Sequence, residues 1–228
     1  MNLIWVMPAE GGRDVPHSSP HTIAVFAGGA PVRPPLAIEF GDVDCVIAAD
    51  GGLYAAEQLG LQVDVLVGDL DSVDEAAIAT ATFEVDRHPR AKDQTDIVLA
   101  LDRAAALGAR RLIVVSGGGG RLDHQLGNLL VLASPDYAAI DVDAFVGSAR
   151  VTVVRDEREL SGRWGELVSL FAVGGPARGV TTVGLRYPLH DDLLEPTSSW
   201  GVSNEFVGDR ASVRLSGGTL LAVQPGEP

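Results

Sequence analysis

Short apolar runs alternate with amphipathic segments along the first two thirds of the chain. Each run spans about five residues and ends near glycine, serine or aspartate, a pattern typical of buried parallel strands. Residues 1–21, which precede the first run, are rich in proline, glycine, serine and histidine and predict a flexible leader. The expected strands are Thr22–Phe26, Cys45–Ala49, Val63–Val67, Leu112–Ser116 and Val142–Val146.

The segments between these runs carry the spacing of amphipathic helices. The clearest stripe runs from Ile97 to Leu107 and is closed by Gly108, and another extends from about Asp123 to a stop at Pro135. Strands that alternate with helices indicate βαβ units. We therefore expect residues 22–148 to form an α/β domain, with a mostly parallel Rossmann-like sheet and helices on both faces.

The pattern changes near residue 149. Helical periodicity ends, and β-rich runs separated by Gly, Pro and Ser turns replace it, which favours an antiparallel β-sandwich domain over residues 149–228. These runs are Val151–Val154, Leu167–Val173, Val180–Val183, Ala211–Leu215 and Thr219–Val223.

Charge and composition narrow the function classes. The chain has 228 residues and a formal net charge of −14, which argues against a nucleic-acid binder and against an anionic membrane surface. The single cysteine, Cys45, excludes an intrachain disulfide and a cysteine-based zinc site. No apolar run reaches the roughly 18 residues of a membrane span, so we expect a cytoplasmic protein. A phosphorylated substrate would need a metal or a few placed cations.

Carboxylates follow two of the expected strands. Asp50 comes after the second strand, and Asp69 and Asp71 come after the third. Open α/β sheets bind ligands at the carboxyl ends of their strands, so these groups can converge. Two carboxylates two residues apart suit Mg²⁺, although helix capping is the plain alternative for Asp50 and for Asp71 or Ser72.

Two further clusters open helices. Lys92, Gln94 and Asp96 stand at the start of the first amphipathic stripe, where the only lysine of the chain offers a compact charge for phosphate. A run of four glycines then leads into the second helix and lets the backbone approach a phosphate closely. The residues of this second cluster are Gly119, Gly120, Arg121, Asp123 and His124.

The roles within the glycine cluster differ. Arg121 can clamp phosphate oxygens and Asp123 can cap the helix, whereas His124 suits capping or packing as well as acid–base chemistry. The glycines do not match G-x-G-x-x-G, and the chain has no P-loop, no G-x-S-x-G elbow and no zinc spacing among its five histidines. The motifs that remain are carboxylates suited to Mg²⁺, a glycine loop and a few cations. They favour a phosphoryl-type transfer that works by positioning the substrates and neutralising their charge.

A polar loop in the expected sandwich carries a different signal. Trp200, Ser203 and Asn204 combine an aromatic ring with hydrogen-bonding groups, which suits a flat, cationic or heteroaromatic ligand. The alternative is that Trp200 fills the edge of a small core.

In their order along the chain, these motifs resemble the thiamine pyrophosphokinase (thiamine diphosphokinase) family. The resemblance covers about Ile23 to Val223, and the first strand departs from it with Ala27-Gly28-Gly29, where the family often has an Asn-Gly pair. The matching segments are Ala49–Gly52, Gly68–Ser72, Lys92–Asp96, Gly119–His124, Gly179–Leu189 and Gly201–Phe206.

The resemblance implies an enzyme that converts ATP and thiamine to thiamine diphosphate and AMP with Mg²⁺. It also implies a homodimer with active sites at the subunit interface. By resemblance, Asp69 and Asp71 hold Mg²⁺ and the polyphosphate, with Asp50 and Asp96 close by. The expected ATP-phosphate contacts are Lys92, Gln94, Gly119, Gly120, Arg121, Asp123 and His124, and the expected thiamine contacts are Trp200, stacking from the partner subunit, Ser203 and Asn204.

Two other functions remain open. A pyrophosphokinase of another hydroxymethyl heterocycle, such as a pterin, could use the same α/β motifs, although the sandwich motifs favour thiamine. A non-catalytic thiamine or nucleotide sensor is the second alternative, and the full set of four aspartate motifs argues against it.

Overall fold

The computed structural model describes residues 22–32, 40–75, 78 and 82–226. The predicted leader, residues 1–21, lies outside the described residues. Part of the segment 74–81, which would form the helix if Asp71 or Ser72 were a helix cap, lies outside them as well. Among the described helices, none is both long and apolar enough to cross a membrane.

Six parallel strands form the sheet of the N-terminal half, in the order β6-β5-β1-β2-β3-β4. Five of them are the apolar runs of the sequence. The sixth, β4, is polar and largely exposed at the sheet edge, so its residues give no apolar signal. The bounds are β1 (Thr22–Ala27), β2 (Cys45–Ala49), β3 (Val65–Gly68), β4 (Glu84–Arg87), β5 (Arg111–Ser116) and β6 (Asp141–Val146).

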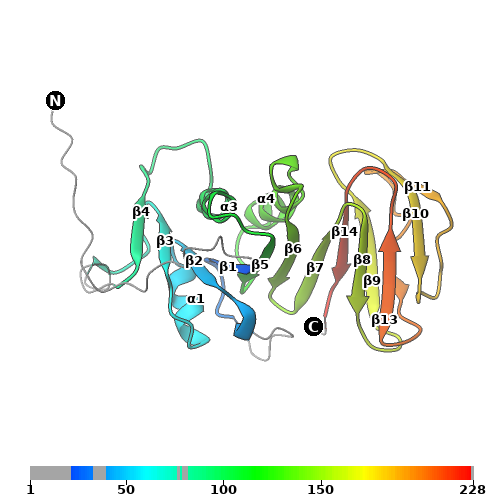
Figure 1. Cartoon of the computed structure of the whole chain (residues 1–228), viewed down its shortest axis with the longest axis horizontal. Helices are drawn as coiled ribbons and strands as arrows, with labels where there is room; N and C mark the ends of the chain where they lie inside the picture. Colours follow the sequence, from blue (N-terminus) through cyan, green and yellow to red (C-terminus); the bar gives the residue numbers. More distant parts are fainter. Residues whose placement is uncertain (1–21, 33–39, 76–77, 79–81, 227–228) are drawn as a thin grey trace.

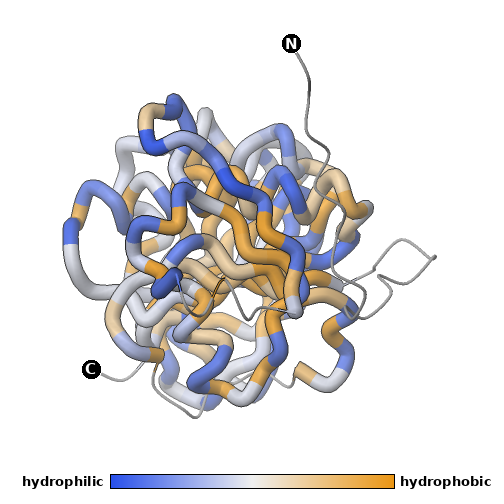
Figure 2. Tube along the Cα trace, turned by 90° about the vertical axis from the view of Figure 1, so that its left-hand side faces the viewer, coloured by the Kyte–Doolittle hydropathy of each residue, from blue (hydrophilic) through white to orange (hydrophobic). Residues whose placement is uncertain are grey.

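Helices cover both faces of this sheet, as predicted (Figure 1). Helix α1 (Gly52–Gln58) packs Leu53 and Ala56 against one face, together with the short 3-10 helix η1 (Phe40–Asp42). Helices α3 (Asp96–Ala106) and α4 (Leu122–Leu132) pack on the other face, followed by η2 (Pro135–Tyr137). Hydrophobic strands occupy the interior of this half of the molecule, with hydrophilic segments around them (Figure 2).

The same sheet continues into the C-terminal half through antiparallel pairing. Strand β6 turns at Gly147 into β7, and the sheet then extends through β14 and β9 to β12. A second, four-stranded sheet, β11-β10-β13-β8, encloses a separate apolar core with this extension. The bounds are β7 (Ala149–Val154), β8 (Glu157–Ser161), β9 (Leu167–Ala172), β10 (Ala177–Val183), β11 (Asp192–Leu194), β12 (Asn204–Glu205), β13 (Arg210–Arg214) and β14 (Leu220–Gln224).

These sheets confirm the predicted fold class of an α/β half followed by an antiparallel sandwich. The division into domains at residues 148 and 149 stays a prediction. It falls in the β6–β7 turn, where the backbone hydrogen bonding of the sheet runs through without a break.

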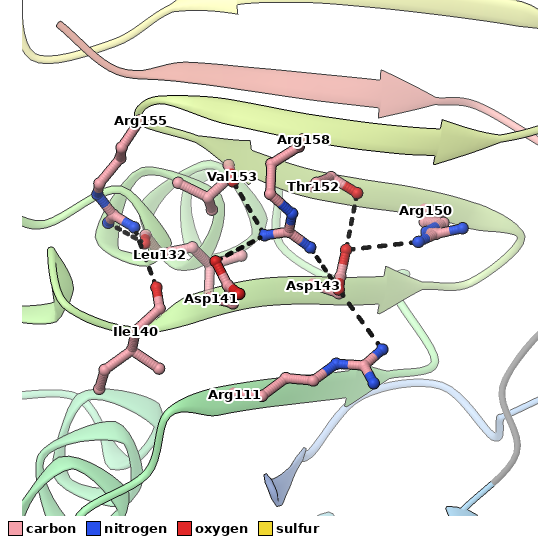
Figure 3. A network of polar contacts seen from close by, with 10 residues as sticks. All are labelled: Arg111, Leu132, Ile140, Asp141, Asp143, Arg150, Thr152, Val153, Arg155 and Arg158. Atoms are coloured by element: carbon pink, nitrogen blue, oxygen red, sulfur yellow. Dashed lines mark hydrogen bonds and ion pairs between the residues drawn. The ribbon is translucent and has the colours of Figure 1, made fainter. Parts of the chain in front are cut away.

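A buried carboxylate lies where the two halves join. Asp143 on β6 is 2 % exposed and accepts hydrogen bonds from Thr152 Oγ1 at 2.8 Å and from Arg158 at 2.9 Å (Figure 3). Arg111 and Arg150 approach the same carboxylate at 3.8 Å and 3.6 Å. One aspartate therefore links side chains from β5, β7 and β8 to the middle of the large sheet.

Candidate active site

Three carboxylates meet at the carboxyl ends of β2 and β3. One oxygen from each of Asp50, Asp69 and Asp71 lies within 4.8 Å of the others. The strands that precede these residues are neighbours in the sheet, which is why motifs about twenty positions apart in the sequence converge. This is the convergence that the sequence predicted for these three side chains.

The backbone around the carboxylates is held in uncommon conformations. Asp50 and Leu70 both have positive φ, 47° and 64°, although neither is glycine. Such conformations cost free energy and persist where the surroundings enforce them, often at functional sites. The N–H of Asp50 donates to the carbonyl of Val67 at 2.9 Å, which ties the first loop to β3.

The donor set fits a hard divalent cation. Asp50 Oδ1 is buried and accepts no hydrogen bond from the described residues, whereas Oδ2 accepts one from Ser72. A buried carboxylate oxygen without a partner is uncommon in a folded protein and is expected where another group binds. Oxygen ligands from clustered carboxylates are those that Mg²⁺ prefers.

Two cations lie beside these carboxylates. Lys92 Nζ pairs with Asp96 Oδ1 at 2.6 Å, and Arg90 pairs with Asp71 at 2.8 Å. Asp96 lies close to the cluster because Gly68 leaves room for it: a Cβ at Gly68 would come within 2.9 Å of Asp96 Oδ1. Part of the negative charge is thus already balanced by cations that a polyphosphate can attract.

All of these groups except Asp71 line one cavity of about 720 Å³. Its wall also includes His124 and Asn128 of α4 and the loop after β1, Gly28–Pro31. The predicted residues that line the cavity are Asp50, Asp69, Lys92, Gln94, Asp96 and His124. Ser72, Arg90 and Tyr54 line it too and were not predicted as site residues. Ser72 is the last residue of the motif Gly68–Ser72 and Arg90 lies two residues before Lys92, whereas nothing in the sequence singles out Tyr54.

The glycine loop lies at the edge of this cavity and not in its wall. Gly118, Gly119 and Gly120 all have φ near +70°, a conformation that disfavours other residues. Arg121 is turned toward Asp123, with hydrogen bonds of 3.1 and 2.5 Å, and this contact lowers the pKa of the Asp123 carboxyl. The phosphate contacts predicted for Gly119, Gly120, Arg121 and Asp123 stay predictions.

Gln94 is held from outside the cavity. Its amide nitrogen donates to Asp102 Oδ2 at 2.9 Å, and the other oxygen of Asp102 accepts from the buried Tyr137 hydroxyl at 2.8 Å. Burial is the largest cause that raises the pKa of Tyr137, so its hydroxyl remains a donor.

The residues predicted to bind thiamine lie far from this cavity within the same chain. Trp200 is 62 % exposed and Ser203 is exposed, just before β12. Strand β12 forms the edge of the large sheet opposite to β4. It lies seven strand spacings from β2, which is a distance of roughly 33 Å across the sheet. Asn204 is buried. Its side-chain oxygen accepts a hydrogen bond from the N–H of Tyr187 at 3.0 Å, and its side-chain nitrogen donates one to the carbonyl of Tyr187 at 2.7 Å. The thiamine contacts of all three residues stay predictions.

Comparison with known proteins gives two matching family models. The model described as "Thiamin pyrophosphokinase, catalytic domain" matches residues 39–143, and "Thiamin pyrophosphokinase, vitamin B1 binding domain" matches residues 150–220. A curated protein named thiamine pyrophosphokinase, from Bacillus subtilis (strain 168), is 25% identical over an alignment of 212 residues that covers 89% of this chain and 98% of that protein.

Solved structures agree on the fold. A thiamin pyrophosphokinase family protein from Enterococcus faecalis superposes with a TM-score of 0.76 at 25% identity, covering 91% of this chain and 100% of that one. Yeast thiamin pyrophosphokinase superposes with a TM-score of 0.68 at 14% identity, covering 92% and 88% of the two chains.

Proposed function

Since the chain belongs to the thiamin pyrophosphokinase family, we propose that it transfers the pyrophosphoryl group of ATP to the hydroxyl of thiamine, giving thiamine diphosphate and AMP. The observation that carries the proposal is the grouping of Asp50, Asp69 and Asp71 beside Lys92 and Arg90. Four of these five residues line the 720 Å³ cavity, and Asp71 borders it.

The cations of the site suit a polyphosphate. Lys92 is mostly buried and Arg90 is largely exposed, and each is paired with a carboxylate in the free protein. ATP phosphates can draw both side chains from Asp96 and Asp71, so binding redistributes existing ion pairs. Mg²⁺ bound by Asp50, Asp69 and Asp71 would neutralise phosphate charge and orient the transferred group.

The reaction needs placement more than a strong base. The thiamine hydroxyl oxygen forms a bond to the β-phosphorus, the bond from that phosphorus to the α,β-bridging oxygen breaks, and AMP leaves with this oxygen. The hydroxyl proton can pass to Asp71 or Asp96. A loose transition state requires little help from a base, so the site's main task is to align the two substrates.

A second copy of the chain completes this site in the proposal. Trp200 and Ser203 lie at the far edge of the large sheet and cannot face the cavity of their own chain. Exposed leucines on α4 (Leu122, Leu126 and Leu130, four residues apart) and Phe171 on β9 offer apolar surface for a homodimer contact. Thiamine would then bind between the cavity of one subunit and Trp200 of the other.

We expect Trp200→Ala to raise the thiamine KM about 5- to 30-fold while changing the ATP KM little, because stacking on a cation is worth about 1–2 kcal/mol. Steady-state kinetics with each substrate varied in turn measure both constants. Trp164→Ala is the matched control, since Trp164 is also exposed. Equal effects of Trp200→Ala on both KM values would contradict thiamine stacking.

Mixing two impaired variants tests the shared site, provided that thiamine is kept well below the wild-type KM, where the raised KM of Trp200→Ala gives low activity. In a dimer of Trp200→Ala with Asp71→Asn, one site combines both changes and the other has neither, so random exchange should restore about a quarter of wild-type activity. Activity is measured after the variants are mixed, unfolded and refolded together. No recovery, with mixed dimers shown to form, would place each site within one chain.

A substrate panel separates the proposal from its alternatives. Thiamine should support AMP release, whereas a hydroxymethyl pterin should not. A preference for the pterin would favour the alternative function, a pyrophosphokinase of another hydroxymethyl heterocycle. Tight binding of thiamine or ATP by calorimetry without AMP release would favour a sensor.

A further inference from the structure

Ser72 connects the two loops that carry the carboxylate cluster. Its hydroxyl donates to Asp50 Oδ2 at 2.5 Å, across 22 residues of sequence. Asp50 follows β2, whereas Ser72 follows β3 and comes directly after Asp71. This hydrogen bond therefore fixes the first loop against the second at the point where the three carboxylates meet.

The contact also selects which oxygen of Asp50 remains available. A carboxylate can rotate so that either oxygen faces a given partner, and a hydrogen bond to one oxygen restricts this rotation. Ser72 donates to Oδ2, while Oδ1 is buried and has no hydrogen-bond partner in the part of the chain that the structure describes. The backbone of Asp50 is fixed as well, by its φ of 47° and by its bond to Val67.

We propose that Ser72 is a positioning residue, which holds Asp50 so that its free oxygen is presented to the divalent cation of the proposed reaction. The inference rests on the proposed function for the identity of that cation. Partners that orient metal ligands typically contribute 10–100-fold to metal affinity. The exposed position of Ser72 means that it contributes little to the core.

The test uses Mn²⁺ alone, with free Mn²⁺ measured by electron paramagnetic resonance on the full chain without nucleotide. Ser72→Ala should weaken Mn²⁺ binding by about 10-fold or more, and Ser72→Thr, which keeps the hydroxyl, should stay within about 3-fold of wild type. Ser161→Ala, a change at an exposed serine on β8, serves as the control and should leave binding unchanged. Thermal melts check that each variant is folded.

A double-mutant cycle separates the inference from the proposed function. Asp50→Asn should weaken Mn²⁺ binding, and Ser72→Ala should add nothing in that background if Ser72 acts through Asp50. Additive effects, or unchanged binding in Ser72→Ala while Asp50→Asn weakens it, would overturn the role of Ser72 and leave the proposed reaction standing. Unchanged binding in Asp50→Asn would show that Asp50 does not bind the cation, and it would overturn the role of Ser72 as well.

Discussion

Replacing Asp71 by asparagine should lower the rate of thiamine diphosphate formation by about 10³-fold or more and leave the fold intact. Charge stabilisation by a bound metal is worth several kcal/mol, and a loss of about 4 kcal/mol corresponds to roughly 10³ in rate. Asp71 is half-exposed, and the described residue that pairs with its side chain, Arg90, is itself largely exposed. Surface ion pairs of this kind contribute about 0–1 kcal/mol to stability.

The measurement combines initial rates with circular dichroism of the same samples. Asp86→Asn is the matched control, because Asp86 is a similarly exposed aspartate on β4 that pairs with His88 outside the carboxylate cluster. It should retain wild-type activity. An Asp71→Asn rate within a few-fold of wild type would remove Asp71 from the mechanism.

Replacing Asp143 by alanine should have the largest effect on stability. The change removes the buried carboxylate that Arg111, Arg150 and Arg158 share, and it leaves Arg158 with the exposed Asp141 as its acidic neighbour (Figure 3). Breaking one side of a buried ion pair costs about 3–5 kcal/mol, which for a chain of this length lowers Tm by roughly 10 °C. Urea unfolding and thermal melts give the two values.

Asp141 provides the control for this prediction. It lies two residues earlier on β6 and contacts the same Arg158 at 3.5 Å, but its side chain is 69 % exposed. Asp141→Ala should lower the free energy of unfolding by less than about 1 kcal/mol. Equal losses for the two variants would mean that the network around Asp143 contributes no more than a surface ion pair.

Much of the fold was predictable because the parallel strands are buried on both faces. Such strands consist of nearly continuous apolar residues, as in Ile23–Ala27 and Leu112–Val115. Strands β4 and β8 escaped prediction because they are rich in charged residues, and the Glu84–Arg87 segment is mostly exposed. The continuation of one sheet through both halves also could not be predicted, since the hydrophobic pattern of a strand does not show which other strand it pairs with.

The site was predictable as far as the order of elements determines it. Asp50 and Asp69 follow adjacent parallel strands, so the sheet alone brings them together. Side-chain partners depend on rotamers and loop paths that no spacing reveals. Two such cases are the hydrogen bond from Ser72 to Asp50 and the hydrogen bond from the Asn204 amide to the backbone of Tyr187. The distance between Trp200 and the cavity likewise emerged only from the strand order.

The most direct test of the account is the identity of the products made from thiamine and γ-labelled ATP by the purified protein with Mg²⁺. Chromatography and mass spectrometry should find one AMP for each thiamine diphosphate, with the γ-label in the thiamine product. ADP together with thiamine monophosphate would show transfer of a single phosphoryl group and contradict the account. Failure to form any phosphorylated thiamine would contradict it as well.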